Sequence, residues 1–331
     1  MISILIPFKN TSKFLTDCLL SIINQSYTKW ELIIIDDHSI DQSYSIVEEF
    51  ANNDPRIKLY KNIGSGIIDA LQLAYKQSKG EFITRMDSDD LMSSNKLEVL
   101  HNALIKHGKR HVSLGMVKYF SDLGINEGFL NYETWLNKLT IKGLNFTEIY
   151  KECPIASPCW MLHREDFDKC GGFDSLIYPE DYDLAFRMYK FKIKCIQSSE
   201  IIHYWRDYAN RSSRIQENYS QKNLLKIKLF YFLNLDYNIN KTLVLWGAGK
   251  KGKFAANFFI KHKVNFTWIC DNPNKIGKNI YGVKLQSFEF LESISNPQSI
   301  ITVANPKAQN DIKEYLNHHK MKPMIDYIFF C

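Results

Sequence analysis

The sequence predicts an α/β protein built on mostly parallel sheets, and three observations lead to that class. Through residues 1–115, short runs rich in Ile, Val and Leu alternate with segments whose apolar residues recur at helical spacing. Several of these runs end in polar residues. The same alternation resumes near Lys241, where a glycine-rich turn separates a strand from a helix. Strands that alternate with helices pair in parallel through right-handed crossovers, so we expect mixed, mostly parallel sheets flanked by helices.

The first part of the chain contains four expected strands joined by three expected helices. The first strand is short, rich in isoleucine and ends at Pro7, which is typical of a buried strand. The first helix carries apolar residues at 14, 15, 19, 22 and 23, which is helical spacing. The expected strands are Ile2–Pro7, Glu31–Ile35, Ile57–Tyr60 and Glu81–Met86, and the expected helices are Thr11–Tyr27, Asp41–Ala51 and 64–75.

Polar residues follow three of these strands, at Lys9–Asn10, Asp36–Asp37 and Asp87–Asp90. Ligands of parallel sheets bind at the carboxyl ends of the strands, so these residues are candidates for one site. The third group, Asp-Ser-Asp-Asp, has three carboxylates in four residues, and a divalent cation with a diphosphate behind it would offset their repulsion. The alternative is a solvated acidic turn that caps the helix after it.

Three motifs in register resemble the family 2 glycosyltransferases, which have a GT-A fold. These are residues 4–10 (ILIPFKN), 34–41 (IIDDHSID) and 86–90 (MDSDD), and the resemblance covers roughly residues 1–215. The resemblance implies transfer of a sugar from a nucleotide sugar, with Asp37 contacting the base. It assigns the nucleotide-sugar site to Pro7, Phe8, Asn10, Asp37, Gly66, Arg85, Asp87, Asp89 and Arg206.

The same resemblance implies a divalent metal, Mn²⁺ or Mg²⁺, which offsets the charge that builds on the leaving diphosphate. Its expected ligands are Asp89, Asp87, Asp90 and His203. Many relatives place an arginine in the helix after the glycines, but residues 66–72 hold none. Arg85 is the nearest cation in sequence, and it either contacts the diphosphate or forms a salt bridge with a neighbouring acid.

A second acidic pair, Glu180-Asp181, stands where a helix is expected to begin. A sugar hydroxyl is a poor nucleophile, and a carboxylate within hydrogen-bond reach can take its proton as the new bond forms. The resemblance makes Asp181 this base, with Glu180 as second choice; acids in a first turn also simply complement the helix dipole. No carboxylate is marked as the nucleophile of a double displacement, so the transfer is expected to invert the anomeric centre.

His203 and Arg206 lie in an aromatic and basic cluster after an apolar pair. In GT-A enzymes this region supplies a further contact to the metal or the diphosphate. The alternative is that the cluster is simply the end of an amphipathic strand, with no role in binding. Arg206, Arg211 and Arg214, with Asn210 between them, are candidates for a loop that closes over the diphosphate.

The C-terminal part carries Gly247-Ala-Gly-Lys-Lys-Gly252 after the expected strand 241–246 and before the expected helix 253–262. With Asp271 about 20 residues on, this is the dinucleotide-binding fingerprint in a Rossmann-like unit. Gly247, Gly249, Gly252 and Asp271 are therefore candidates for binding NAD(P) or another nucleotide. Tight packing of the turn explains the glycines equally well.

Composition narrows the class of partners. The net charge is +6, and from Lys241 onward 13 lysines and no arginine face six acidic residues. This excess favours an anionic membrane surface or phosphorylated ligands, whereas nucleic acid is not expected without arginines and interleaved aromatics. Seven cysteines without a CxxC pair, and no expected signal peptide or spanning segment, indicate a cytoplasmic protein. Through its basic C-terminal part, this protein is expected to associate peripherally with the inner face of the plasma membrane.

We therefore expect a GT-A catalytic domain over 1–218, a connecting helix and linker over 219–240, and a small Rossmann-like domain over 241–331. The expected function is metal-dependent, inverting transfer of a sugar from a UDP-sugar to a glycan or lipid-linked acceptor in surface polysaccharide synthesis. A homo-oligomer is among the expected assemblies. Two alternatives are an NAD(P)-dependent oxidoreductase that uses the glycine-rich turn and a non-catalytic scaffold that binds nucleotide sugars.

Overall fold

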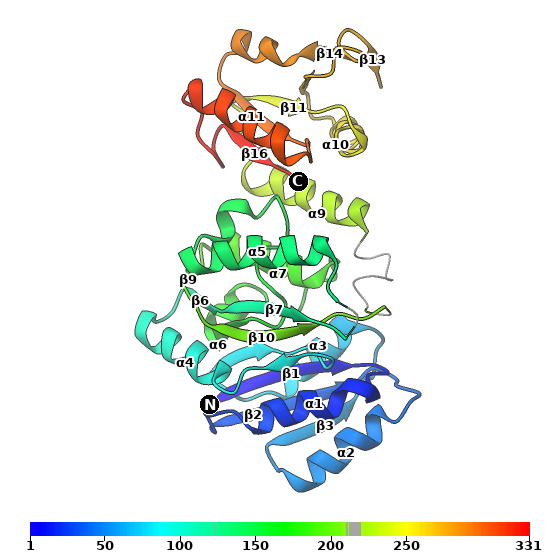
Figure 1. Ribbon diagram of the computed structural model, residues 1–331, viewed down its shortest axis with the longest axis vertical. Coiled ribbons are helices and arrows are strands. Elements are labelled where there is room, and N and C mark those ends of the chain that lie inside the picture. Colours follow the sequence, from blue (N-terminus) through cyan, green and yellow to red (C-terminus); the bar gives the residue numbers. More distant parts are fainter. Residues whose placement is uncertain (123, 210, 212–219) are drawn as a thin grey trace. The chain divides into compact units, whose positions relative to one another are not determined.

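The computed structural model describes residues 1–122, 124–209, 211 and 220–331, and it divides into two compact units (Figure 1). The first unit comprises Met1–Phe146 and Cys153–Ile215, and the second comprises Thr147–Glu152 and Gln216–Cys331. The first unit has two sheets and the second has one; each unit has its own core, and we describe each by itself.

The first unit begins with a regular alternation of strands and helices and continues with shorter elements. Its strands are β1 (Ile2–Phe8), β2 (Trp30–Asp36), β3 (Ile57–Lys61), β4 (Phe82–Arg85), β5 (Leu91–Met92), β6 (His111–Leu114), β7 (Met116–Phe120), β8 (Trp160–His163), β9 (Lys194–Ile196) and β10 (Ile201–Arg206). Its helices are α1 (Ser12–Ile23), α2 (Ser43–Asn53), α3 (Ile67–Gln77), α4 (Lys96–His107), α5 (Glu127–Lys142), the 3₁₀ turn η1 (Asn145–Glu148, whose last two residues belong to the second unit), α6 (Arg164–Lys169) and α7 (Glu180–Lys190).

The main sheet of this unit is mixed, in the order β3-β2-β1-β4-β8-β6-β9. Strands β3, β2, β1 and β4 are parallel, and β8 is antiparallel to both of its neighbours. The register pairs Phe8 with Asp36 and Leu5 with Arg85, so β1, β2 and β4 end at one edge of the sheet. The polar residues that follow these three strands therefore share that edge, as the sequence predicts.

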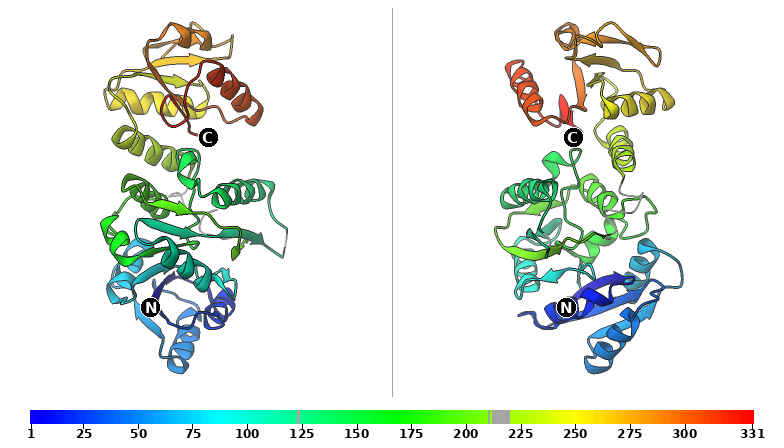
Figure 2. Two further views of the ribbon diagram at one scale, coloured as in Figure 1. Left: turned by 90° about the vertical axis from the view of Figure 1, so that its left-hand side faces the viewer. Right: turned by 45° about the vertical axis from the view of Figure 1, so that its right-hand side comes forward.

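Apolar side chains on both faces of the parallel strands hold the helices in place. The even-numbered residues of β1 and β2 pack with α1, α2 and α4 in one core, which includes Ile4, Leu19 and Leu100. Alternate residues of a strand point to opposite faces, so the odd-numbered residues face the other way, toward α3, which contacts β1 and β2. Figure 2 shows the strands of this unit with helices packed against them.

A second sheet has three strands, in the order β5-β10-β7, and its strand β5 follows the acidic turn directly. Strand β5 begins directly after Asp90 and pairs antiparallel with β10, which contains His203 and Arg206. Strand β10 also pairs in parallel with β7. This pairing brings residues more than 100 positions apart beside the acidic turn.

The second unit has one sheet in the order β13-β14-β12-β11-β15-β16, parallel except for the β13–β14 hairpin. The parallel strands have the order seen in doubly wound α/β folds, and the strand order reverses direction between β11 and β15. Its elements are α9 (Gln221–Leu235), β11 (Thr242–Trp246), α10 (Lys250–Lys261), β12 (Thr267–Cys270), β13 (Asn279–Ile280), β14 (Val283–Ser287), η3 (Phe288–Ser293), β15 (Pro297–Ile301), α11 (Pro306–His318) and β16 (Tyr327–Phe329). Its core contains Val244, Trp246, Ile269 and Leu316.

The predicted strands and helices of residues 1–90 are all present, with ends that differ by a few residues. Strand β4 ends at Arg85, one residue before the predicted end, because Met86 already begins the acidic turn. Helix α2 begins at Ser43 because Asp41 lies outside it and accepts a hydrogen bond from the Ser43 amide. Helix α10 begins three residues earlier than predicted, directly after Gly249.

Candidate functional site

The acidic turn Asp87–Asp90 continues β4 at the edge where the parallel strands end. The amide of Met86 donates to the carbonyl of Leu5, which keeps the start of the turn against β1. The Cys18 thiol of α1 lies 3.5 Å from the carbonyl of Asp87. The turn is thus anchored on both sides, and its three carboxylates have separate surroundings.

Asp89 is half-buried, and its carboxylate accepts a hydrogen bond of 2.8 Å from the Tyr208 hydroxyl. Arg206 donates from Nε to the Asp89 carbonyl over 2.9 Å. Burial, with the nearby charges of Asp90 and Asp87, raises the pKa of Asp89 to about 7. The charge of Arg211 and the hydrogen bond from Tyr208 oppose this rise in the pKa but do not cancel it.

Asp90 and His203 are both 0% exposed and bind each other. His203 Nε2 lies 3.0 Å from Asp90 Oδ2, and the amide of Arg206 donates to Asp90 Oδ1 over 2.8 Å. On the other side of the ring, Lys96 Nζ lies 3.3 Å from His203 Nδ1 and 2.6 Å from the carbonyl of Pro158. Burial and the charge of Lys96 lower the pKa of His203 well below its ordinary value, which favours a neutral ring that donates to Asp90 and accepts from Lys96.

The residues expected to hold a metal thus separate into two kinds of position. Asp87 and Asp89 have partly exposed carboxylates. Asp90 and His203 are buried, and their polar side-chain atoms contact each other, Lys96 and the amide of Arg206. In the described part of the chain, no three His, Cys, Asp or Glu side chains converge closely enough to hold a metal ion. Carboxylate oxygens are the donors that Mg²⁺ and Mn²⁺ prefer, and the raised pKa of Asp89 marks a place where a cation would relieve repulsion.

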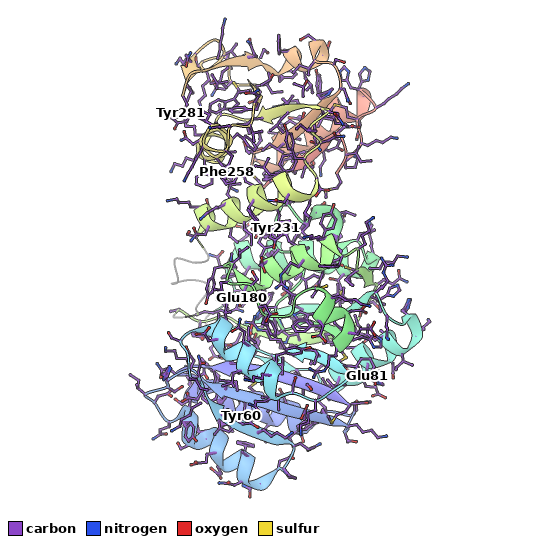
Figure 3. The ribbon with its side chains drawn as sticks, turned by 180° about the vertical axis from the view of Figure 1, so that it is seen from behind. Tyr60, Glu81, Glu180, Tyr231, Phe258 and Tyr281 are labelled. Carbon is purple, nitrogen blue, oxygen red and sulfur yellow. The ribbon has the colours of Figure 1, made fainter. Side chains whose placement is uncertain are left out.

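Arg85 joins the acidic turn to helix α7. Its side chain is 5% exposed, with Nη2 3.1 Å from Asp87 Oδ1 and Nη1 2.9 Å from Glu180 Oε1. Of the two interpretations left open by the sequence, the salt bridge is observed, since Arg85 pairs with two acids; its contact with the diphosphate stays a prediction. Figure 3 labels Glu180, the first residue of α7.

Asp181 follows Glu180 in the first turn of α7, and its surroundings differ. Glu180 is buried against Arg85, whereas Asp181 is half-buried and accepts a hydrogen bond from the Tyr182 amide. Burial and the charge of Glu180 raise the pKa of Asp181 well above the ordinary value, although Arg85 opposes the shift. A carboxylate whose pKa lies closer to neutral is better suited to accept a proton at the pH of a cell.

Asp37 organises the loop that follows β3. Its Oδ1 accepts from Asn62 Nδ2 over 2.7 Å and from the Gly66 amide over 2.9 Å, and Lys9 Nζ lies 3.4 Å from Oδ2. Burial opposes ionisation, but the hydrogen bonds from Asn62 and Gly66 and the charge of Lys9 lower the pKa of Asp37 overall. Gly66 has φ +90°, a conformation that favours glycine, so the loop needs both this residue and the Asp37 carboxylate.

The remaining residues assigned near the nucleotide have mixed positions. Phe8 is a core residue, 2% exposed, so only its backbone lies at the edge of the sheet. Pro7 is half-buried, and Asn10 is exposed and accepts a hydrogen bond from the Ile40 amide. Asn10 therefore holds the loop after β2 beside the loop after β1.

Arg206 lies between two aromatic rings, with its guanidinium carbon 4.7 Å from the centroid of Phe14 and 4.6 Å from that of Phe120. Its Nε donates to the backbone carbonyl of Asp89 and so stabilises the acidic turn. Arg211 is 8% exposed and lies over the ring of Trp205. Asn210 and Arg214, which belong to the expected closing loop, lie outside the described residues.

The glycine-rich turn of the second unit is explained largely by close packing. Gly247 has φ +114°, and a Cβ built on Gly252 would lie 2.0 Å from the carbonyl oxygen of Gly247. The Trp268 indole donates to that same carbonyl. Gly249 has open space around it, and Asp271 is exposed after β12.

Several residues of the site were not predicted. Asn62 follows β3 at the same edge as the other polar strand ends, so the rule that found Asp37 could have found it. Lys96 and Tyr208 offered no such signal. Tyr208 reaches the acidic turn only because β10 pairs with β5, and Lys96, the first residue of α4, reaches Met86 and His203 only through tertiary packing.

The chain matches the family model described as glycosyl transferase family 2 over residues 3–171, which is more than half of its length. The chain belongs to this family. Within it, the chain is 36% identical over 102 residues to glycosyltransferase GlyG of Streptococcus pneumoniae serotype 4, which covers 30% of this chain and 34% of GlyG. It is also 36% identical over 108 residues to the Escherichia coli protein named UDP-Glc:alpha-D-GlcNAc-diphosphoundecaprenol beta-1,3-glucosyltransferase WfgD, covering 32% of this chain and 42% of WfgD. The chain thus spans less than half the length of these two relatives.

The fold of this family 2 protein is similar to a solved structure of S. aureus TarS (residues 1–349) in complex with UDP-GlcNAc, with a TM-score of 0.56 and 20% identity. The similarity covers 79% of this chain and 72% of that chain. The predicted GT-A fold is therefore confirmed. Over the described residues, no helix is both long enough and apolar enough to cross a membrane.

Proposed function

We propose that this family 2 protein is a metal-dependent, inverting glycosyltransferase that uses a UDP-sugar and a hydroxyl group of a glycan or lipid-linked acceptor. The observation that carries the proposal is the pair of contacts of Arg85. They connect Asp87 in the acidic turn with Glu180 at the start of α7, so the expected donor end and the expected base belong to one site.

In this proposal Asp89 and Asp87 hold the divalent cation, which when bound would offset the charge that develops on the departing diphosphate. Asp90 and His203 support the turn from the interior and are not included among the ligands. Asp37, with the loop that ends at Gly66, shapes the part of the site that receives the base. The presence of UDP-GlcNAc in the TarS complex and of UDP-Glc in the name of WfgD supports a uridine nucleotide as the donor's carrier.

Asp181 is the proposed general base, and it removes the proton of the acceptor hydroxyl as that oxygen attacks the anomeric carbon. Glu180 is less suited to this role because its carboxylate is buried and held by Arg85. A single displacement by the acceptor inverts the anomeric centre. The second unit offers no comparable support for an oxidoreductase, because packing accounts for Gly247 and Gly252.

The full chain should be incubated with a panel of UDP-, GDP- and CMP-sugars, each with MnCl₂, with MgCl₂ or with EDTA. We expect release of nucleoside diphosphate from a UDP-sugar that depends on the metal. The anomeric configuration of the product, read by NMR, tests inversion. Turnover that persists in EDTA would contradict metal dependence, and retention of configuration would contradict the single displacement.

A further inference from the structure

Arg85 makes the most direct connection between the two acidic groups of the site. One planar guanidinium donates in two directions, to Asp87, two residues along the chain, and to Glu180, 95 residues away. The Arg85 and Glu180 side chains are 5% and 4% exposed, and that of Asp87 is 21% exposed. The contact therefore joins the carboxyl end of β4 to the amino end of α7 in a largely water-free environment.

The geometry of a guanidinium makes this connection stiff. Its N–H groups lie in one plane and form directed, charge-assisted hydrogen bonds, whereas a lysine ammonium is a compact charge on a flexible stem. Two carboxylates bound to different nitrogens of one guanidinium are held in a fixed relation to each other. A displacement of Asp87 would thus act on Glu180 through a rigid group.

Glu180 stands directly before Asp181 at the start of α7. The two residues are adjacent in the first turn of α7, where successive side chains are about 100° apart around the helix axis. Holding Glu180 therefore sets the rotation of the helix at its first turn and, with it, the direction of the next side chain. The charge of Arg85 also acts on Asp181 directly, since it opposes the rise in the pKa of that carboxyl.

We propose that Arg85 is a positioning residue that couples binding of the nucleoside diphosphate and metal at the acidic turn to the orientation of Asp181 on α7. The inference rests on the proposed function and adds a role that is neither nucleotide contact nor proton transfer. When Asp87 binds the metal, its carboxylate shifts, and Arg85 shifts with it and moves Glu180 at the start of α7.

A binding experiment on the full chain tests the coupling without turnover. Hydrogen exchange of α7 peptides is compared with and without UDP plus MnCl₂ in the wild type, Arg85→Gln and Arg187→Gln. Arg187 is the matched control, because it also lies on α7 and pairs with an acid, Asp183, but does not contact the acidic turn. We expect slower α7 exchange on UDP binding in the wild type and in Arg187→Gln, and loss of that response in Arg85→Gln, each measured at a UDP concentration that saturates the variant.

A kinetic experiment separates positioning from stability. With the UDP-sugar found in the donor panel, Arg85→Lys should lower kcat about 10²-fold with a small change in donor KM, because a small displacement of a catalytic group has effects of this size. The double variant Arg85→Gln with Glu180→Gln removes the unpaired buried charge of the single variants. We expect it to regain stability without regaining kcat.

Three results would overturn the proposal. One is an α7 response in Arg85→Gln equal to that of the wild type, and another is recovery of kcat together with stability in the double variant. The third is a tenfold or greater loss of UDP affinity in Arg85→Lys with kcat unchanged, which would make Arg85 a nucleotide ligand. A wild-type chain that binds UDP with Mn²⁺ but shows no turnover would refute the proposed function, whereas the exchange experiment would still decide the coupling.

Discussion

His203 Nε2 lies 3.0 Å from Asp90 Oδ2, and neither side chain is exposed to solvent. This pair ties the last residue of the acidic turn to strand β10, and Lys96 extends it to the loop that contains Pro158. The arrangement is that of an interior support. The two residues were expected to be metal ligands, and their contacts lead to a different set of predictions.

Replacing His203 with Ala should destabilise the fold rather than remove a metal ligand. The change leaves Asp90 and Lys96 buried without their shared partner, and breaking a buried charged network costs about 3 kcal/mol. Urea denaturation in EDTA measures this loss. His203→Gln, which keeps a donor and an acceptor, is the control and should recover part of it. Unchanged stability together with a large loss of Mn²⁺ affinity would show that His203 is a ligand after all.

Replacing Asp89 with Ala should abolish metal-dependent turnover, because its partly exposed carboxylate is the proposed principal ligand. Mn²⁺ binding, measured by calorimetry in the presence of UDP, should weaken at least tenfold. Asp17→Asn is the matched control, since the Asp17 side chain is 62% exposed and pairs with Arg206, which also contacts Asp89, over 3.5 Å. Wild-type turnover in a folded Asp89→Ala protein would contradict the assignment of the metal site.

Replacing Asp181 with Asn should leave UDP binding intact and lower the rate of transfer by roughly 10²-fold or more, the contribution expected of a general base. Asp174→Asn, in the exposed loop before α7, is the control and should keep its activity. If Asp181→Asn instead weakens UDP binding while kcat is kept, the residue has a binding role.

The pKa of Asp181 also predicts the pH dependence of the rate. The residue acts as a base only when it is ionised, and burial with the Glu180 charge raises its pKa above the ordinary value of about 4. The acidic limb of a plot of kcat against pH should therefore fall closer to neutrality than to pH 4. Glu180→Gln removes one cause of the raised pKa and should move this limb to lower pH. A limb near pH 4 in the wild type would contradict the prediction.

Stability without metal should decrease as the pH rises, because of Asp89. Its pKa is about 7 in the folded chain and near 4 when unfolded, so the folded state binds the proton more tightly. Below pH 4 both states are protonated and there is no penalty; between about pH 4 and 7 the unfolding free energy should fall by roughly 1–3 kcal/mol. Urea denaturation in EDTA across this range measures the decrease. Asp89→Asn should reduce the decrease without abolishing it, because burial also raises the pKa of Asp90 and of Asp181, and MnCl₂ should reverse it.

Much of the first unit was predictable because it rests on local patterns. The period of apolar residues identified β1 to β4 and α1 to α3, and the rule that parallel strands end at one edge placed Asp37 beside the acidic turn. The same rule would have found Asn62. These inferences succeed because a parallel α/β unit repeats one geometry, and each strand carries its own hydrophobic signal.

The sequence by itself determined the family, the fold class and the identity of the acidic groups, since these depend on short motifs and on residue spacing. Only the tertiary structure decided how those acids differ. Asp90 and His203 support the interior, Glu180 is held by Arg85, and Asp89 and Asp181 remain partly exposed with raised pKa values. The reason is physical: burial and hydrogen-bond partners set the state of a carboxylate, and here they come from β10 and α7, about 90 to 120 residues away along the chain.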